Sequence, residues 1–103
     1  MPTIDEALTY LGIDYTDDEM INRNVTRALA TAEKTLHGAV GEDLETYLPA
    51  DPRTTELVLI YMEDLYSQRG LAAKVSNATR RLVFDMEQQL RMELRAAKEA
   101  AGV

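Results

Sequence analysis

Residues 3–21 read Thr-Ile-Asp-Glu-Ala-Leu-Thr-Tyr-Leu-Gly-Ile-Asp-Tyr-Thr-Asp-Asp-Glu-Met-Ile, and this stretch decides how the fold begins. It holds two copies of one helix-start signal, TIDE at 3–6 and TDDE at 16–19, on either side of Gly12. In such a capping box the threonine oxygen accepts a hydrogen bond from a first-turn amide, while the glutamate three residues later reaches back. The stretch therefore predicts a short helix, a turn at Gly12 and a longer helix capped by Thr16.

The spacing of apolar residues predicts the same two helices. Apolar side chains recur at helical spacing over residues 4–11, and Gly12 suits the left-handed position that closes a helix. After the second signal they form one narrow stripe that runs to Gly38. The stripe comprises Ile21, Val25, Ala28, Leu29, Ala32 and Leu36, and Arg23, Arg27 and Lys34 lie opposite it. We therefore expect an amphipathic second helix that ends at Gly38.

Two more helices are expected in the second half of the chain. Asp51-Pro52 predicts the start of the third, because aspartate caps helices and proline suits the first helical position. This helix should end at Gly70, and its apolar arc exceeds half the circumference, as in a central or shared helix. The fourth should run from about Thr79 to Ala100, with Ser76 or Asn77 as its cap. Its core stripe comprises Leu82, Val83, Met86, Leu90, Leu94 and Ala97.

These patterns predict a single all-α domain over residues 1–103, a small bundle of four helices. The first helix is short, the other three are long, and a long loop at 38–51 joins the second to the third, because no clear helical or strand period runs through it. Four apolar residues of this loop form a candidate docking site: Val40, Leu44, Tyr47 and Leu48. They would either dock on a partner or cover the chain's own core.

Composition limits the classes of function. At 103 residues and 46% apolar residues, without a Pro- or Gly-rich linker, the chain can bury one modest core. Cysteine is absent, so disulfides, a thiolate nucleophile and Cys-ligated metals are excluded, and an intracellular setting is expected. The amino terminus has neither the basic region nor the apolar stretch of a signal peptide, and no membrane span is expected.

The net charge of −7 is unevenly distributed. Residues 1–52 hold 11 acids and 3 bases, whereas residues 53–103 hold 7 acids and 8 bases. Duplex-binding domains show the opposite balance, so tight DNA binding is not expected. An acidic half and a mixed half could bring copies of the chain together head to tail, or the acids could form a solvated surface that keeps a monomer soluble.

No pattern in the chain predicts catalysis. The acids at 14–19 do not match a calcium loop, because Glu19 and Val25 stand where glycine and glutamate are required. They are explained by capping and by the positive end of a helix dipole. His37, near the end of the second helix, complements the opposite end of that dipole. Gly-rich phosphate loops, nucleophile elbows and zinc-binding His pairs do not occur, so we expect no enzyme activity, no cofactor and no metal site.

Surplus apolar surface indicates an interface between subunits. Phe84 and Met92 project from the back of the last helix with Gln88 between them, opposite its core stripe. They are either an intersubunit contact or ordinary exposed residues. Together with the surplus face of the third helix, the candidate interface comprises Leu59, Ile60, Met62, Tyr66, Phe84, Gln88 and Met92.

The order of the motifs also carries a family resemblance. The opening Ile4-Asp-Glu-Ala-Leu-Thr-Tyr-Leu-Gly-Ile-Asp14 is followed by the acidic turn Asp17-Asp-Glu-Met-Ile21 and a long helix. A proline-led helix then carries the run Leu57-Val-Leu-Ile-Tyr-Met62 and ends in Leu65-Tyr-Ser-Gln-Arg69, and Leu90-Arg91 lies in the amphipathic closing helix. Over nearly its whole length the chain resembles head–tail connector, or adaptor, proteins of tailed bacteriophages and prophages. It departs from them at Leu65, which replaces the first residue of an aromatic pair.

The resemblance implies a structural virion protein at the head–tail interface, present in the host cytoplasm during assembly. Its partners would be copies of itself, in a ring of about twelve subunits, the portal protein above, and a stopper, head-completion or tail protein below. DNA would pass through the ring without tight or specific binding, and no membrane would be involved. The alternative is a small phage regulatory or DNA-packaging protein of helix-turn-helix type, whose reading surface would carry the acids at 14–19 that phosphate repels.

Overall fold

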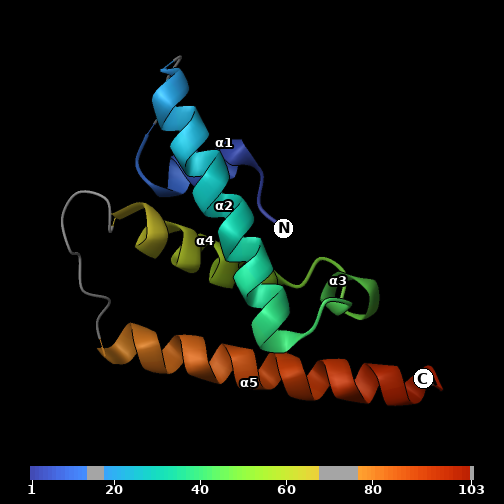
Figure 1. Ribbon diagram of the computed structural model, residues 1–103. Coiled ribbons are helices and arrows are strands. Elements are labelled where there is room, and N and C mark those ends of the chain that lie inside the picture. The colour runs from blue at the N-terminus through green and yellow to red at the C-terminus, as the bar shows by residue number, and fades with distance from the viewer. Residues whose placement is uncertain (14–17, 68–76, 103) are drawn as a thin grey trace.

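The computed structural model describes residues 1–13, 18–67 and 77–102, and every regular element within these ranges is helical. Its five helices are α1 (Ile4–Tyr10), α2 (Glu19–Val40), α3 (Leu44–Tyr47), α4 (Pro52–Ser67) and α5 (Asn77–Ala100) (Figure 1). The all-α prediction is confirmed. The expected arrangement of four helices and a long loop is not, because α3 forms inside the segment expected to be the loop.

Helix α1 begins and ends where the sequence predicts. The Thr3 hydroxyl oxygen accepts a hydrogen bond from the Glu6 amide at 3.2 Å, and the Glu6 carboxylate accepts one from the Thr3 amide at 3.2 Å. This reciprocal capping box satisfies two amides that the helix itself cannot pair. Gly12 follows the helix with φ +79°, the left-handed conformation expected of it.

Helix α2 differs from the prediction at both ends. Asp18 is its cap, with a carboxylate that accepts from the Met20 amide at 2.9 Å, whereas Thr16 lies outside the described residues. At the other end the helix passes through Gly38, which has no left-handed backbone, and ends at Gly41, where φ is +154°. A glycine inside a helix costs only about 1 kcal/mol relative to alanine, so a glycine alone does not end a helix.

Helices α2 and α4 cross at the centre of the molecule, and the other helices pack around this pair. Figure 1 shows α1 beside the first half of α2, and α5 across the end where α2 finishes. The largest fully buried side chains are Leu36, Leu44, Leu57, Met62, Leu90, Val25 and Val58. The molecule measures 48 × 29 × 19 Å, and its radius of gyration of 14.8 Å exceeds the roughly 13 Å of a compact chain of this length. The long α5 helix accounts for this elongation.

The segment 38–51 covers the chain's own core. Leu44 of α3 is fully buried, and Val40 and Leu48 pack partly buried against the core. Tyr47 remains half-buried. Leu44 is therefore not accessible to a partner, and the docking-loop interpretation is wrong for this residue, because its side chain is needed to close the end of the core between α2 and α5.

The second half of the chain also departs from expectation in places. Leu82, expected in the core stripe of the last helix, is 55% exposed, because α5 meets the core through the face that carries Leu90 and Leu94. Helix α5 already includes Asn77, two residues before the expected start. The predicted cap Ser76 and the predicted helix end at Gly70 both lie outside the described residues.

Candidate interaction surfaces

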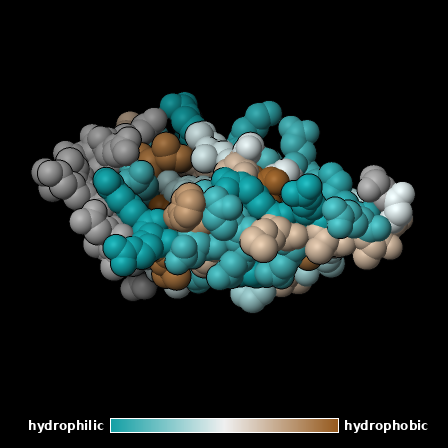
Figure 2. Space-filling model, turned by 90° about the horizontal axis from the view of Figure 1, so that it is seen from below, coloured by the Kyte–Doolittle hydropathy of each residue, from teal (hydrophilic) through white to brown (hydrophobic). Residues whose placement is uncertain are grey.

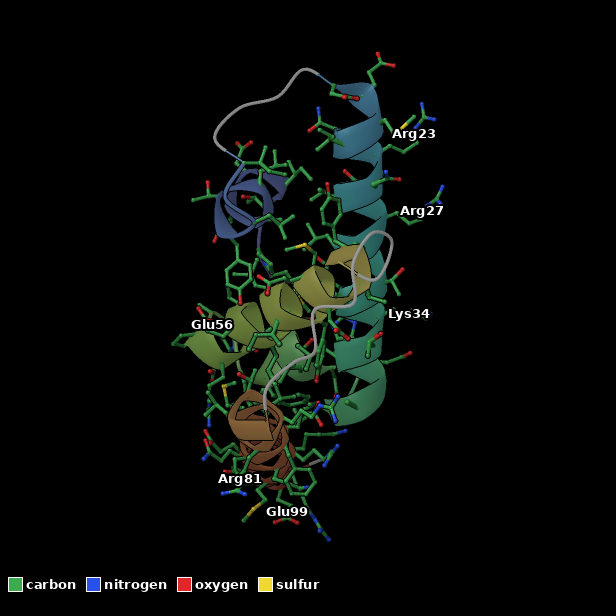
Figure 3. All side chains as sticks on the ribbon, turned by 90° about the vertical axis from the view of Figure 1, so that its left-hand side faces the viewer. Arg23, Arg27, Lys34, Glu56, Arg81 and Glu99 are labelled. Atoms are coloured by element: carbon green, nitrogen blue, oxygen red, sulfur yellow. The ribbon has the colours of Figure 1, made fainter. Side chains whose placement is uncertain are left out.

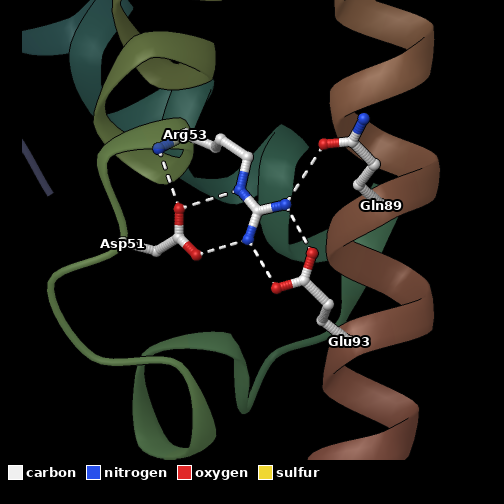
Figure 4. A network of polar contacts seen from close by, with 4 residues as sticks. All are labelled: Asp51, Arg53, Gln89 and Glu93. Carbon is white, nitrogen blue, oxygen red and sulfur yellow. Dashed lines mark hydrogen bonds and ion pairs between the residues drawn. The ribbon is translucent and has the colours of Figure 1, made fainter.

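A charged network attaches α5 to the start of α4. The Asp51 carboxylate caps α4 by accepting from the Arg53 amide at 2.9 Å, which confirms the predicted Asp51-Pro52 start. It also accepts from the Arg53 guanidinium at 3.0 and 2.7 Å. The same guanidinium donates to both Glu93 carboxylate oxygens, at 2.5 and 2.7 Å, and to the Gln89 side chain at 3.2 Å (Figure 4). One arginine thus joins the α4 cap to two turns of α5.

The network perturbs the titration of its members. Hydrogen bonds to Glu93 and Asp51 raise the pKa of Arg53. The Arg53 guanidinium in turn lowers the pKa of Asp51 and of Glu93, which stay ionised into the acid range. Sequence patterns did not reveal this network, because its two halves are 40 positions apart and share no local motif.

Three more polar contacts attach the inner side of α5. The Tyr61 hydroxyl of α4 donates to the Glu87 carboxylate, and burial together with this carboxylate raises the pKa of Tyr61. The Arg91 Nε atom donates to the Ala39 carbonyl oxygen near the end of α2 at 2.6 Å. Lys98 pairs with Asp43, the residue before α3, at 2.7 Å. Helix α5 is therefore held along much of its length, and its opposite side is presented at a fixed orientation.

The outer face of α5, which we define as Phe84, Gln88 and Met92, carries unburied apolar side chains. Phe84 is 58% exposed and Met92 is 70% exposed, whereas Gln88 is half-buried. Figure 2 looks onto α5 from outside and shows apolar patches among the hydrophilic side chains. The geometry confirms that Phe84 and Met92 project away from the core. Their contact with another subunit stays a prediction.

The α4 residues of the candidate interface divide into two groups. Met62 is fully buried and Leu59 nearly so, within this chain's own core, so their assignment to a subunit interface is wrong. Both lie on the side of α4 that faces the other helices, which explains why the apolar arc of this helix is so wide. Ile60 and Tyr66 are half-buried and retain surface that a partner could contact.

The described part of the chain holds no group of side chains arranged to bind a metal ion. No three His, Asp or Glu side chains there are grouped to hold a metal ion. A shallow pocket of about 320 Å³ beside α5 is lined by Arg91, Arg95, Lys98 and Glu99, but its cations already have partners. Arg95 pairs with Glu99 at 3.7 Å and Lys98 with Asp43, so the pocket offers no free charge for a ligand. His37 pairs with Glu45 at 2.7 Å, which connects α2 to α3.

None of the helices, over their described residues, has an apolar stretch long enough to cross a membrane. No protein-family model, curated protein or solved structure matches the chain. Support for a function therefore comes from the surfaces of the molecule and from the order of motifs in its sequence.

Proposed function

We propose that this chain is a structural virion protein, a head–tail connector subunit. In this proposal its copies assemble as a ring under the portal, join the portal to the next head-completion or tail protein, and leave a channel for DNA. Two independent features support it: the order of motifs over the sequence, and the apolar outer face of α5. The outer face carries the proposal, because it is the surface on which the molecule leaves large apolar side chains unburied along one helix.

Burial of this face against a neighbour would stabilise an assembly. Complete burial of an exposed Phe or Met side chain contributes about 1.5–3 kcal/mol, so the partly exposed Phe84 and Met92 would each contribute about 1 kcal/mol. The helix that carries them has 24 residues and is therefore about 36 Å long. Because the Arg53 network holds it, little conformational entropy is lost when the face meets a partner.

The test is assembly with the portal protein of the phage that encodes the chain. Negative-stain microscopy and native mass spectrometry should show rings of the wild-type protein on the portal. F84D/M92D should remain monomeric there, with an unchanged far-ultraviolet circular dichroism spectrum and melting temperature. T46D/A100D is the matched control, because it adds two negative charges at exposed positions away from the face and should still assemble. A wild-type monomer that ignores the portal, or F84D/M92D rings like those of the wild type, would overturn the proposal.

The alternative of a DNA-binding regulator has one observation in its favour. Arg23, Arg27 and Lys34 are exposed along one side of α2. Three cations on a chain of net charge −7 are few for duplex binding, which draws its affinity from many phosphate contacts. A fluorescent-duplex titration at about 50 and 200 mM salt separates the two functions. Micromolar affinity that falls steeply with salt would favour the regulator.

A further inference from the structure

The outward side of α2 carries a basic face, defined as Arg23, Arg27 and Lys34. All three side chains are exposed, and Figure 3 shows them pointing to the same side, away from α4. Among residues 1–13, 18–67 and 77–102, none of the three forms an ion pair. On α5, Arg91, Arg95 and Lys98 each have a carboxylate partner, whereas the exposed Arg80 and Arg81 form no ion pair within the described ranges either. The three cations of α2 are distinguished by lying along one side of one helix.

Helix α4 carries an acidic face, defined as Glu56 and Glu63 with Ile60 between them. Both glutamates are exposed and Ile60 is half-buried. No cation of the described chain pairs with either glutamate. Tyr10 of α1 lies close by, and its pKa is raised by burial and then by the charges of Glu63 and Glu56. In Figure 3 Glu56 lies on the side of the molecule opposite the basic face.

The two faces match in spacing as well as in charge. Arg27 and Lys34 are seven positions apart, as are Glu56 and Glu63. Two residues seven positions apart lie on nearly the same side of a helix, about 10.5 Å apart along its axis. In an antiparallel arrangement Arg27 would meet Glu63 and Lys34 would meet Glu56. The exposed Ala30, three positions after Arg27, would then lie against Ile60, three positions before Glu63. A small side chain thus faces a large one between the two charge pairs.

We propose that the basic face of one copy docks antiparallel on the acidic face of the next, with Arg27 on Glu63, Lys34 on Glu56 and Ala30 on Ile60. This seam rests on the proposed function, since it supplies a contact between neighbouring subunits of the ring. The two faces belong to different helices, and Glu56 lies on the side away from the basic face. Each contact therefore leaves a basic face free at one end of the assembly and an acidic face free at the other. Such a heterologous contact continues to add subunits, and it forms a ring where the rotation between neighbours closes and an open filament where it does not.

The chemistry of the seam determines how it responds to salt. Exposed ion pairs contribute little affinity each, but they fix register and exclude wrong partners. Contact between Ile60 and Ala30 adds a small apolar contribution. We therefore expect the seam to be weak in isolation, to weaken as salt rises from about 20 to 500 mM, and to select one orientation. Nucleic acid is the competing occupant of the basic face, and the matched spacing favours a second copy.

Cysteine cross-linking tests the register, because the chain has no cysteine of its own. The A30C and I60C proteins, mixed at low salt under mild oxidation, should form a disulfide-linked dimer of the two chains. A chain with both substitutions should give a ladder of larger species. The pair A30C and M92C is the control, since Met92 is exposed but lies outside the seam. A30C/I60C cross-linking no greater than this control would overturn the proposed register.

Charge exchange tests the complementarity. In sedimentation velocity at low salt, the wild type should form species larger than a monomer. R27E/K34E and E56K/E63K should each lower the association constant of this self-association at least tenfold. The quadruple variant R27E/K34E/E56K/E63K keeps the net charge of −7 and should again form the larger species, because the charges of both faces are reversed together. E19K/E42K is the matched control for E56K/E63K and should associate like the wild type.

A wild-type monomer at every concentration, or a quadruple variant that stays dispersed, would overturn the seam. The seam would also be overturned if the wild type bound a DNA duplex with micromolar affinity and R27E/K34E abolished that binding. These measurements need no portal, so their failure is distinct from that of the connector. If the seam fails while F84D/M92D still controls assembly on the portal, the connector function stands with another contact between subunits. If the seam holds but the portal is ignored, the chain is a self-associating protein of another kind.

Discussion

Arg53 of α4 and Glu93 of α5 form a two-pronged pair, with the guanidinium Nη1 and Nη2 atoms 2.5 and 2.7 Å from the two carboxylate oxygens. Such a pair restrains angle as well as distance, because both planar groups must align. It fixes how α5 crosses the end of α4, and so how the outer face of α5 is presented. The same guanidinium donates to Asp51, so one side chain joins the capping carboxylate of α4 to α5.

Replacement of Arg53 should therefore destabilise the fold more than replacement of an ordinary surface arginine does. We expect R53A to lower the free energy of unfolding by about 1–2 kcal/mol, after allowance for solvent screening of a partly exposed group. R53K should fall between R53A and the wild type, because an ammonium keeps the charge and loses the paired geometry. Urea denaturation followed by circular dichroism measures both. R95A is the control, since Arg95 is largely exposed and has a single long contact. Equal stability of R53A and R95A would contradict the prediction.

Acid should weaken the same network. The pKa of Asp51 and that of Glu93 are lowered by Arg53, and the pKa of Asp43 is lowered by Lys98. A carboxyl whose folded-state pKa lies below its unfolded value stabilises the fold above the unfolded value and loses that contribution as the pH falls through the folded value. Urea midpoints should therefore drop below about pH 4. In R53A the urea midpoint should fall less steeply as the pH is lowered. A fall as steep as that of the wild type would refute the link to this network.

Thr54 is a buried polar residue at which stability can be gained. Its hydroxyl is buried, and no group of the described chain forms a hydrogen bond with it. Because desolvation of an unpaired hydroxyl is unfavourable, T54V should raise the free energy of unfolding by about 1 kcal/mol. Thermal and urea unfolding measure the gain. T35V is the matched control, since the exposed Thr35 hydroxyl donates to the Thr31 carbonyl at 2.8 Å, and it should not be stabilised. A loss of stability in T54V would show that the hydroxyl has a partner in solution.

The two glycines at the end of α2 should respond oppositely to alanine. Gly38 lies inside the helix with nothing within 4 Å of an added Cβ, so G38A should stabilise by about 0.5–1 kcal/mol. Gly41 has φ +154°, and its Cβ would lie 2.7 Å from Leu94 Cδ2, so G41A should destabilise by about 1–3 kcal/mol. Melting temperatures of the two variants provide the comparison. The same sign for both would contradict the placement of the helix end.

Local chemistry alone determined much of this molecule. The capping box at Thr3, the turn at Gly12 and the Asp51-Pro52 start are interactions among residues near one another in sequence, so their patterns predict them directly. Helical periodicity likewise predicted an all-α chain, and it placed Phe84 and Met92 on an exposed face.

Contacts between distant residues decided the rest. Gly38 and Gly41 are both glycines near the end of the apolar stripe, and only the structure shows that the second takes a positive φ of +154° and lies close to Leu94. Leu59 and Met62 look like surplus surface until the helices around α4 bury them, and Leu82 looks like core until α5 turns its other side inward. The bond between Arg53 and Glu93 joins positions 40 apart. A helical pattern specifies which residues share a face, whereas the neighbour that covers that face is set by packing among helices far apart in the chain.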